Sequence, residues 1–289
     1  MSPFTKVVFW FVAANALVGA GSLTLFPAET DRLFFWGIEP PINAALFGML
    51  YLGGAVVVGM LAYLGRWEPA RFLIPILVSA GVMITATTLL HLDLFTPGPR
   101  LVYWLVVYVG APLLAVFSYA RHERRGADWT AYRPITPATR GFAIMVGAVL
   151  VLLGVLVLVR PSPVVAQWPW PITPLMVRLF ASWFAAFGMG LLWFWVERDW
   201  DRVRHVADLM IAASGLDLLM VLVHREDLTN VGPNLWLYCS HLAMFGLVGL
   251  LMHRLQRKPV RFPSGDHGIS VERGNGDMSG LKATGRERR

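Results

Sequence analysis

Apolar residues gather in eight long blocks, separated by short polar or proline-rich segments. Each block runs for about 20 residues with few charges, which is the length an α-helix needs to cross the hydrocarbon core of a bilayer. The pattern therefore predicts an all-α integral membrane protein with eight transmembrane helices. The predicted spans cover roughly residues 7–26, 42–64, 72–92, 101–119, 140–159, 175–196, 206–224 and 235–253.

The last four blocks repeat features of the first four at a constant offset of 133 positions. The aligned pairs are Pro41 and Pro174, Arg71 and Arg204, His91 and His224, and Thr96 and Thr229. Because each half holds an even number of spans, both halves insert with the same polarity, which predicts a tandem parallel repeat. We expect a first four-helix unit over 1–119, a charged linker over 120–139, a second unit over 140–256 and a disordered basic tail over 257–289.

Composition agrees with a membrane protein and leaves no room for a separate soluble domain. Hydrophobic residues make up 56% of the chain and charged residues 15%, against about 25% charged in an ordinary soluble domain. The formal net charge is +7, and residues 254–289 alone hold nine Lys or Arg against four Asp or Glu. A basic tail beside a bilayer predicts orientation and contact with anionic lipid, and we expect no nucleic-acid partner.

The loop charges predict the orientation of the chain. If the N-terminus is cytoplasmic, most of the arginines that lie between spans fall on the cytoplasmic side, and Arg32, Arg100, Arg160 and Arg225 fall on the other. By the positive-inside rule, this asymmetry predicts a multi-pass protein of the plasma (cytoplasmic) membrane with both termini inside.

The connections at 27–41 and 160–174 are rich in proline and tryptophan. Proline interrupts helices, and tryptophan favours the headgroup level of a membrane. Two interpretations stay open: these loops anchor the protein at the interface, or they form lids over an outward-facing cavity between the two repeats.

Polar residues inside the spans are few and favour the second half. In the seventh span Ser214, Asp217 and His224 share one helix face, and in the eighth span Asn234, Tyr238 and His241 share another. Adjacent antiparallel helices would bring Asp217 and His241 to one level, since each lies seven residues from the outer end of its face. A buried aspartate is usually paired or neutralised.

We therefore predict a carboxylate–imidazole pair of Asp217 and His241, with Arg178 of the sixth span as a third member. The first half does not repeat this pair, because the matching positions are Ile84 and Tyr108. The asymmetry favours a functional site, while a structural hydrogen bond between the last two helices remains the alternative.

The outer ends of the third and seventh spans carry two His–acid pairs, His91 with Asp93 and His224 with Glu226. Four such ligands suit Zn²⁺ if the repeat brings them together. The alternative is that they mark where the helices leave the membrane. A proton-sensing role is a third interpretation, since histidine titrates near neutral pH.

Several catalytic motifs are missing from the sequence, namely paired diphosphate-binding motifs, a GxSxG elbow and a P-loop. No lysine lies inside a span, which excludes a retinal Schiff base. Two four-helix repeats resemble the layout of the haem A synthase family, which implies haem-ligand histidines in the even-numbered helices of both halves. Only His241 lies well inside an even-numbered span here, so we predict no haem and no other cofactor.

Two function classes follow. The first is a transporter-like or ligand-binding protein whose cavity contains Asp217 and His241. The second is a non-catalytic accessory or assembly subunit with a membrane protein partner. A weaker third is a membrane enzyme that acts on a lipid or quinone.

Overall fold

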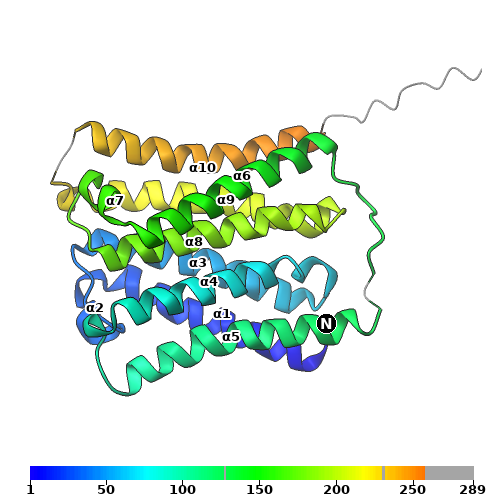
Figure 1. Cartoon of the computed structure of the whole chain (residues 1–289), viewed down its shortest axis with the longest axis horizontal. Helices are drawn as coiled ribbons and strands as arrows, with labels where there is room; N and C mark the ends of the chain where they lie inside the picture. Colours follow the sequence, from blue (N-terminus) through cyan, green and yellow to red (C-terminus); the bar gives the residue numbers. More distant parts are fainter. Residues whose placement is uncertain (127, 230–231, 258–289) are drawn as a thin grey trace, which may run out of the picture. The chain divides into compact units, whose positions relative to one another are not determined.

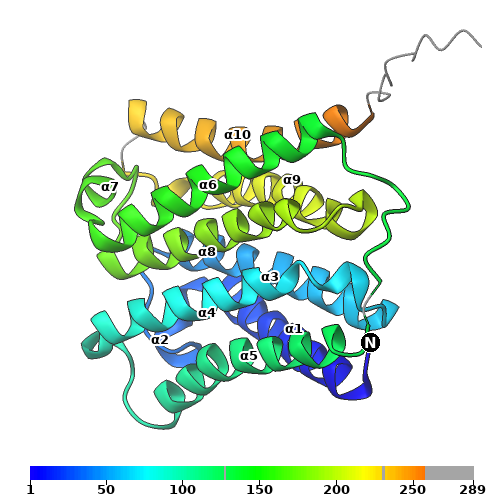
Figure 2. The ribbon, with the colours of Figure 1, turned by 45° about the vertical axis from the view of Figure 1, so that its right-hand side comes forward.

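The computed structural model describes residues 1–126, 128–229 and 232–257, and within these ranges the chain is helical without a β-strand (Figures 1 and 2). The elements are α1 (Pro3–Leu25), η1 (Pro27–Glu29), α2 (Thr30–Leu33), α3 (Pro41–Leu64), η2 (Glu68–Ala70), α4 (Leu73–Leu90), η3 (Leu92–Leu94), α5 (Pro99–Glu123), α6 (Pro137–Val159), α7 (Ser162–Gln167), α8 (Pro174–Leu192), η4 (Trp193–Trp195), α9 (Trp200–Val223), η5 (Arg225–Asp227) and α10 (Pro233–Arg257).

The eight predicted spans are confirmed as helices that are long and apolar enough to cross a membrane. Some helices extend beyond their apolar blocks: α5 continues to Glu123, and α9 begins at Trp200 instead of near residue 206. Hydropathy marks the part of a helix that lies in lipid, whereas capping decides where the helix ends. At the start of α9, the side chain of Asp199 accepts a hydrogen bond from the backbone N–H of Asp201. The predicted tail lies almost entirely outside the described residues.

The long helices pack in pairs within each half, and two further pairings link the halves. Helix α1 packs on α3, α4 on α5, α6 on α8 and α9 on α10, while α4 also packs on α8 and α3 on α9. The most buried are α3 and α8, with 72% of each apolar window inside the protein against 22% for α5 and α6. Helices α3 and α8 therefore form the centre, and α5 and α6 present most of their surface to lipid.

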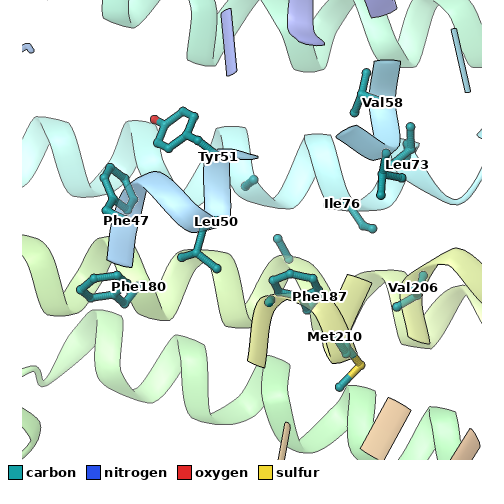
Figure 3. Packing of buried hydrophobic residues seen from close by; sticks show 14 of the residues in the cluster. Phe47, Leu50, Tyr51, Val58, Leu73, Ile76, Phe180, Phe187, Val206 and Met210 are labelled. Atoms are coloured by element: carbon teal, nitrogen blue, oxygen red, sulfur yellow. The ribbon is translucent and has the colours of Figure 1, made fainter. Parts of the chain in front are cut away.

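Apolar side chains from both halves interlock where α3 and α4 meet α8 and α9 (Figure 3). Phe47 and Phe180 meet edge to face with ring centroids 5.9 Å apart. Elsewhere small residues lie between the helices. Lipid supplies no hydrophobic drive for helix association, so the helices depend on close van der Waals contact, which small residues permit. A Cβ atom on Gly147 of α6 would lie 2.8 Å from the carbonyl oxygen of Gly188 on α8, so this contact requires glycine.

A network of charged side chains, of which Arg71, Glu197 and Arg202 are buried, lies at the end of the bundle that carries the N-terminus and residues 124–126 and 128–136 (Figure 1). We call this end the linker end. Arg71 is fully buried, with Nε 3.4 Å from Glu123 Oε1 and Nη1 3.6 Å from Glu197 Oε2. Arg202 approaches the other oxygen of Glu197 at 3.5 Å and Asp128 Oδ2 at 3.2 Å. The network thus joins α5, α9, the segment after η4 and the α5–α6 connection.

Hydrogen bonds donated by backbone N–H groups also hold the α5–α6 connection in place. Both Tyr132 N–H and Arg133 N–H donate to Asp199 Oδ2, and Ile135 N–H donates to the carbonyl of Arg198. The connection is therefore fixed against the segment that joins η4 to α9.

A candidate ligand-binding pocket around Asp217

A pocket of about 470 Å³ opens among the helices of the second half. Its walls come from α6, α7, α8, α9 and α10, and α3 contributes Leu46 and Leu50. We predicted a cavity between the two halves, but this pocket belongs mainly to the second half. Helices α6, α8 and α10 surround it, and among the described residues of the first half only those of α3 reach it. Most of the wall is apolar, which suits a lipophilic ligand.

Asp217 of α9 is the acidic residue in this wall. The residue is 7% exposed, and its Oδ1 atom has no hydrogen-bond partner among the described residues. An ionised carboxylate at the centre of a bilayer costs about 2.5–3.5 kcal/mol on insertion scales, and more when nothing pairs with it. The position therefore calls for a proton, a cation or a hydrogen-bond donor from a ligand.

Aromatic side chains line the part of the pocket formed by α7, α8 and α10. The Trp168 ring stacks on Phe180 with centroids 5.9 Å apart and meets Tyr238 edge to face at 5.0 Å. The indole N–H of Trp168 is buried and has no acceptor among the described residues. Aromatic faces attract cations through their quadrupole. A carboxylate beside such a wall is a combination that suits an organic ammonium group.

The loop that carries Trp168 is fastened to the first half. Trp170 is buried, and its Nε1–H donates to Asn43 Oδ1 at 2.8 Å, while the Asn43 amide donates to the carbonyl of Pro171 at 3.0 Å. Both Trp-rich connections contribute to pocket walls: residues 33–35 of the first line a separate pocket, and Trp168 and Pro169 of the second line this one.

The structure brings four of the predicted site residues to this pocket: Asp217, Asn234, Tyr238 and His241. The predicted direct pair is not formed, since no hydrogen bond or ion pair joins Asp217 to His241 in the described part of the chain. His241 also has an exposed surface, and its ring lies 5.5 Å from that of Phe184. It lies at the edge of the pocket, with Asp217 deeper inside.

The predicted partners Ser214 and Arg178 bond elsewhere. Ser214 Oγ donates to the carbonyl of Leu242 at 2.7 Å and so fastens α9 to α10. Arg178 donates from Nε to the carbonyl of Leu158 at 2.8 Å and lies 2.7 Å from His91 Nε2 through Nη1. Arg178 therefore serves a contact between α8 and the end of α4, because these two helices pack together.

Burial lowers the pKa of His91, and the positive charge of Arg178 lowers it further. A neutral imidazole is also what this contact needs, because His91 Nε2 has to accept the hydrogen bond from the guanidinium. His91 and Arg178 thus form an inter-half contact outside the pocket.

The outer His–acid residues do not assemble into a metal site. His224 Nδ1 lies 3.6 Å from Asp227 Oδ2, whereas Glu226 and Asp93 are exposed. Within the described ranges, no three His, Cys, Asp or Glu side chains are grouped as metal ligands. Asp227 also accepts a hydrogen bond from the backbone N–H of Ile42 at 2.9 Å, so this end of α9 is tied to the start of α3.

Tyr108, the counterpart of His241, lies in the first half and shares a hydrogen bond with Tyr51. Sequence patterns missed Tyr51, which looks like an ordinary core aromatic, and Gln167, which follows no repeat. Trp168 could have been found, because it belongs to one of the two unusual Trp-rich connections.

Comparison of the chain with protein-family models, with curated proteins and with solved structures finds no match. Evidence for function therefore comes from the chemistry of this pocket.

Proposed function

We propose that this is a transporter-like or ligand-binding membrane protein whose pocket around Asp217 accepts a lipophilic organic amine or ammonium. One observation carries the proposal: Asp217 Oδ1 is buried in the wall of an apolar pocket, and no described residue forms a hydrogen bond with it. A ligand with a cationic N–H would donate a hydrogen bond to Asp217 Oδ1 and so remove the free-energy cost of a buried, unpaired acceptor. The apolar part of the ligand would fill the rest of the pocket.

The neighbours of Asp217 narrow the ligand class. Aromatic rings in the pocket wall favour a cationic ligand, because the face of each ring is negative. These negative faces, together with Asp217, disfavour an anionic ligand. The rings are those of Trp168, Phe180, Phe184 and Tyr238. Asn234 and Gln167 add neutral polar groups at the same wall. We therefore expect selectivity for a single positive charge on an apolar body.

A thermal-shift series on the detergent-purified full chain tests this proposal. N,N-dimethyl-3-phenylpropylamine is compared with the uncharged isostere in which CH replaces the nitrogen. At about 100 times its Kd the amine should add about 2.7 kcal/mol, which corresponds to roughly 5–10 °C in Tm for a chain of this size. The isostere should shift the Tm much less.

Two variants make the test specific. Asp217→Asn keeps the shape and removes the charge, so the shift by the amine should largely vanish. Asp208→Asn is the matched control on the same helix, because Asp208 pairs with His253 at 2.8 Å and lies outside the pocket. Equal shifts in all three proteins would contradict the proposal, and purification with a stoichiometric membrane partner would favour the accessory-subunit hypothesis instead.

We also propose that the chain is a tandem repeat of two four-helix units. Its support is the pairing of helices, since α1 on α3, α4 on α5 and α4 on α8 correspond to α6 on α8, α9 on α10 and α9 on α3. The short helix η3 follows α4 as η5 follows α9, at the offset of 133 that aligns His91 with His224.

The helix starts support the repeat at atomic detail. Ser2 caps α1 and its backbone N–H donates to His122 near the end of α5 at 3.0 Å. Thr136 caps α6 and its backbone N–H donates to Gln256 near the end of α10 at 3.1 Å. A hydroxyl-bearing cap with a partner near the end of the last helix of its half thus recurs in both halves.

For orientation we propose that both termini are cytoplasmic, in the plasma membrane, as the loop charges predict. Single cysteines in a Cys239→Ser background test this with a membrane-impermeant thiol reagent on intact cells. Ser162→Cys in α7 should be labelled, and Arg125→Cys in the α5–α6 connection should be labelled only after lysis. The reverse pattern would invert the topology.

A further inference from the structure

A second pocket, of about 350 Å³, lies in the first half. Helices α1, α3, α4 and α5 and residues 33–35 line it, and α8 contributes Trp183. It occupies the place that corresponds to the Asp217 pocket under the repeat, but its chemistry differs. Ile84, the counterpart of Asp217, is fully buried, and Tyr108 stands where the second half has His241.

Flat aromatic surfaces dominate this pocket. Trp104 lies 4.3 Å from Tyr108 and 4.8 Å from Phe35, measured between ring centroids, and Phe35 stacks on Tyr103 at 6.2 Å. Among its described lining residues none is Asp, Glu, Lys, Arg or His. The pocket therefore suits a neutral, planar and apolar molecule.

Hydrogen-bond donors remain unused in this pocket. Trp183 Nε1–H is buried and has no acceptor within the described part of the chain, and Trp183 packs 5.8 Å from Tyr51. Tyr51 and Tyr108 bond to each other through their hydroxyls, so one of the two O–H protons is used and the other has no acceptor among the described residues. Trp104, by contrast, is already paired, since its Nε1–H donates to Thr88 Oγ1 at 2.9 Å.

From these observations we propose that the first-half pocket binds a planar neutral lipophile with a carbonyl acceptor, of the quinone class. The ring packs against the wall formed by Trp104, Tyr108 and Phe35, and a carbonyl oxygen accepts from Trp183 Nε1–H and the remaining tyrosine hydroxyl. The site differs from the Asp217 pocket, because no carboxylate lies among its described lining residues and its unpaired donors call for an acceptor.

Equilibrium binding of 2-decyl-1,4-benzoquinone to the detergent-purified full chain tests this proposal. The Tyr51→Phe/Tyr108→Phe double variant should bind about tenfold more weakly, which equals about 1.4 kcal/mol, and Trp183→Phe should weaken binding similarly. The Tyr63→Phe variant is the control, because Tyr63 is exposed on α3 and lies outside the pocket. Its affinity should equal that of the wild type.

Two further arms separate the ring, the carbonyl and the pocket. Decylbenzene keeps the ring without an acceptor, and saturating phosphatidylcholine offers ester carbonyls without a ring; both should compete poorly with the quinone. Ala111→Trp fills the pocket and should abolish binding, while the ligand-free Tm of every variant reports on its folding. Undiminished quinone binding by the tyrosine, tryptophan and pocket-filling variants, or equal competition by either comparator, would overturn the proposal.

Discussion

The sharpest prediction concerns Arg71, whose guanidinium is fully buried at the linker end. It contacts Glu123 and Glu197 and stacks over the ring of Trp129 at 3.9 Å. It also donates to the carbonyl of Asp128 in the α5–α6 connection. Replacing Arg71 by Ala would leave Glu197, which is 1% exposed, with Arg202 as its remaining cationic partner.

The magnitude follows from this burial. Removing one partner of a buried ion pair costs about 3–5 kcal/mol, because the remaining charge stays desolvated. At about 2–4 °C per kcal/mol for a chain of this size, Arg71→Ala should lower the Tm by roughly 6–20 °C. Trypsin should also cut faster after Arg124 and Arg125, because the connection loses one of its anchors.

Arg204 supplies the matched control, since it is the repeat counterpart of Arg71. Its side chain is 45% exposed, and it approaches Asp201 only to 3.9 Å. An exposed pair of this kind contributes about 0–1 kcal/mol, so Arg204→Ala should lower the Tm by no more than about 4 °C. Equal, small losses of Tm in both variants, with unchanged tryptic cleavage, would refute the role given to the Arg71 network.

Two further predictions concern pH and helix packing. The pKa of His91 in the folded protein lies below its ordinary value of 6.5. As the pH falls, His91 of the unfolded chain is therefore protonated before His91 of the folded protein. The stability that neutral His91 contributes is therefore complete above pH 6.5 and is lost as the pH falls from 6.5 through the lower pKa of the folded protein. His91→Gln should flatten the fall in Tm between pH 8 and 5. An unchanged pH profile of Tm would contradict this. Gly147→Ala should cost about 1–3 kcal/mol in SDS-unfolding experiments, because the new methyl meets the Gly188 carbonyl, whereas Gly141→Ala in open space should be neutral or stabilising. Equal effects of the two substitutions would remove the close-packing explanation.

The eight spans could be predicted from the sequence because a bilayer imposes a length and a polarity on every helix. Their ends could not, because a cap such as Asp199 acts outside the apolar block. The pairing of helices across the halves could not be predicted either, because the sequence of α4 contains no local pattern that specifies its packing on α8.

The same limit explains the candidate site. Shared helix faces were enough to place Asn234, Tyr238 and His241 in one wall with Asp217. The place of Arg178 at the outer end of the sixth span predicts a contact with Asp217 and His241, but the packing of α8 on α4 brings it to His91. Contacts between distant parts of the chain decide such choices, and no local pattern encodes them.

The central claim is that Asp217 recognises a cation in an apolar pocket, and a binding cycle tests it most directly. The Kd of the phenylpropylamine and that of its uncharged isostere are measured on the wild type and on Asp217→Asn. A hydrogen bond to a charged group contributes about 1.5–3 kcal/mol, so the preference for the amine should fall by roughly 10- to 150-fold in the variant. The same preference in both proteins would contradict the claim.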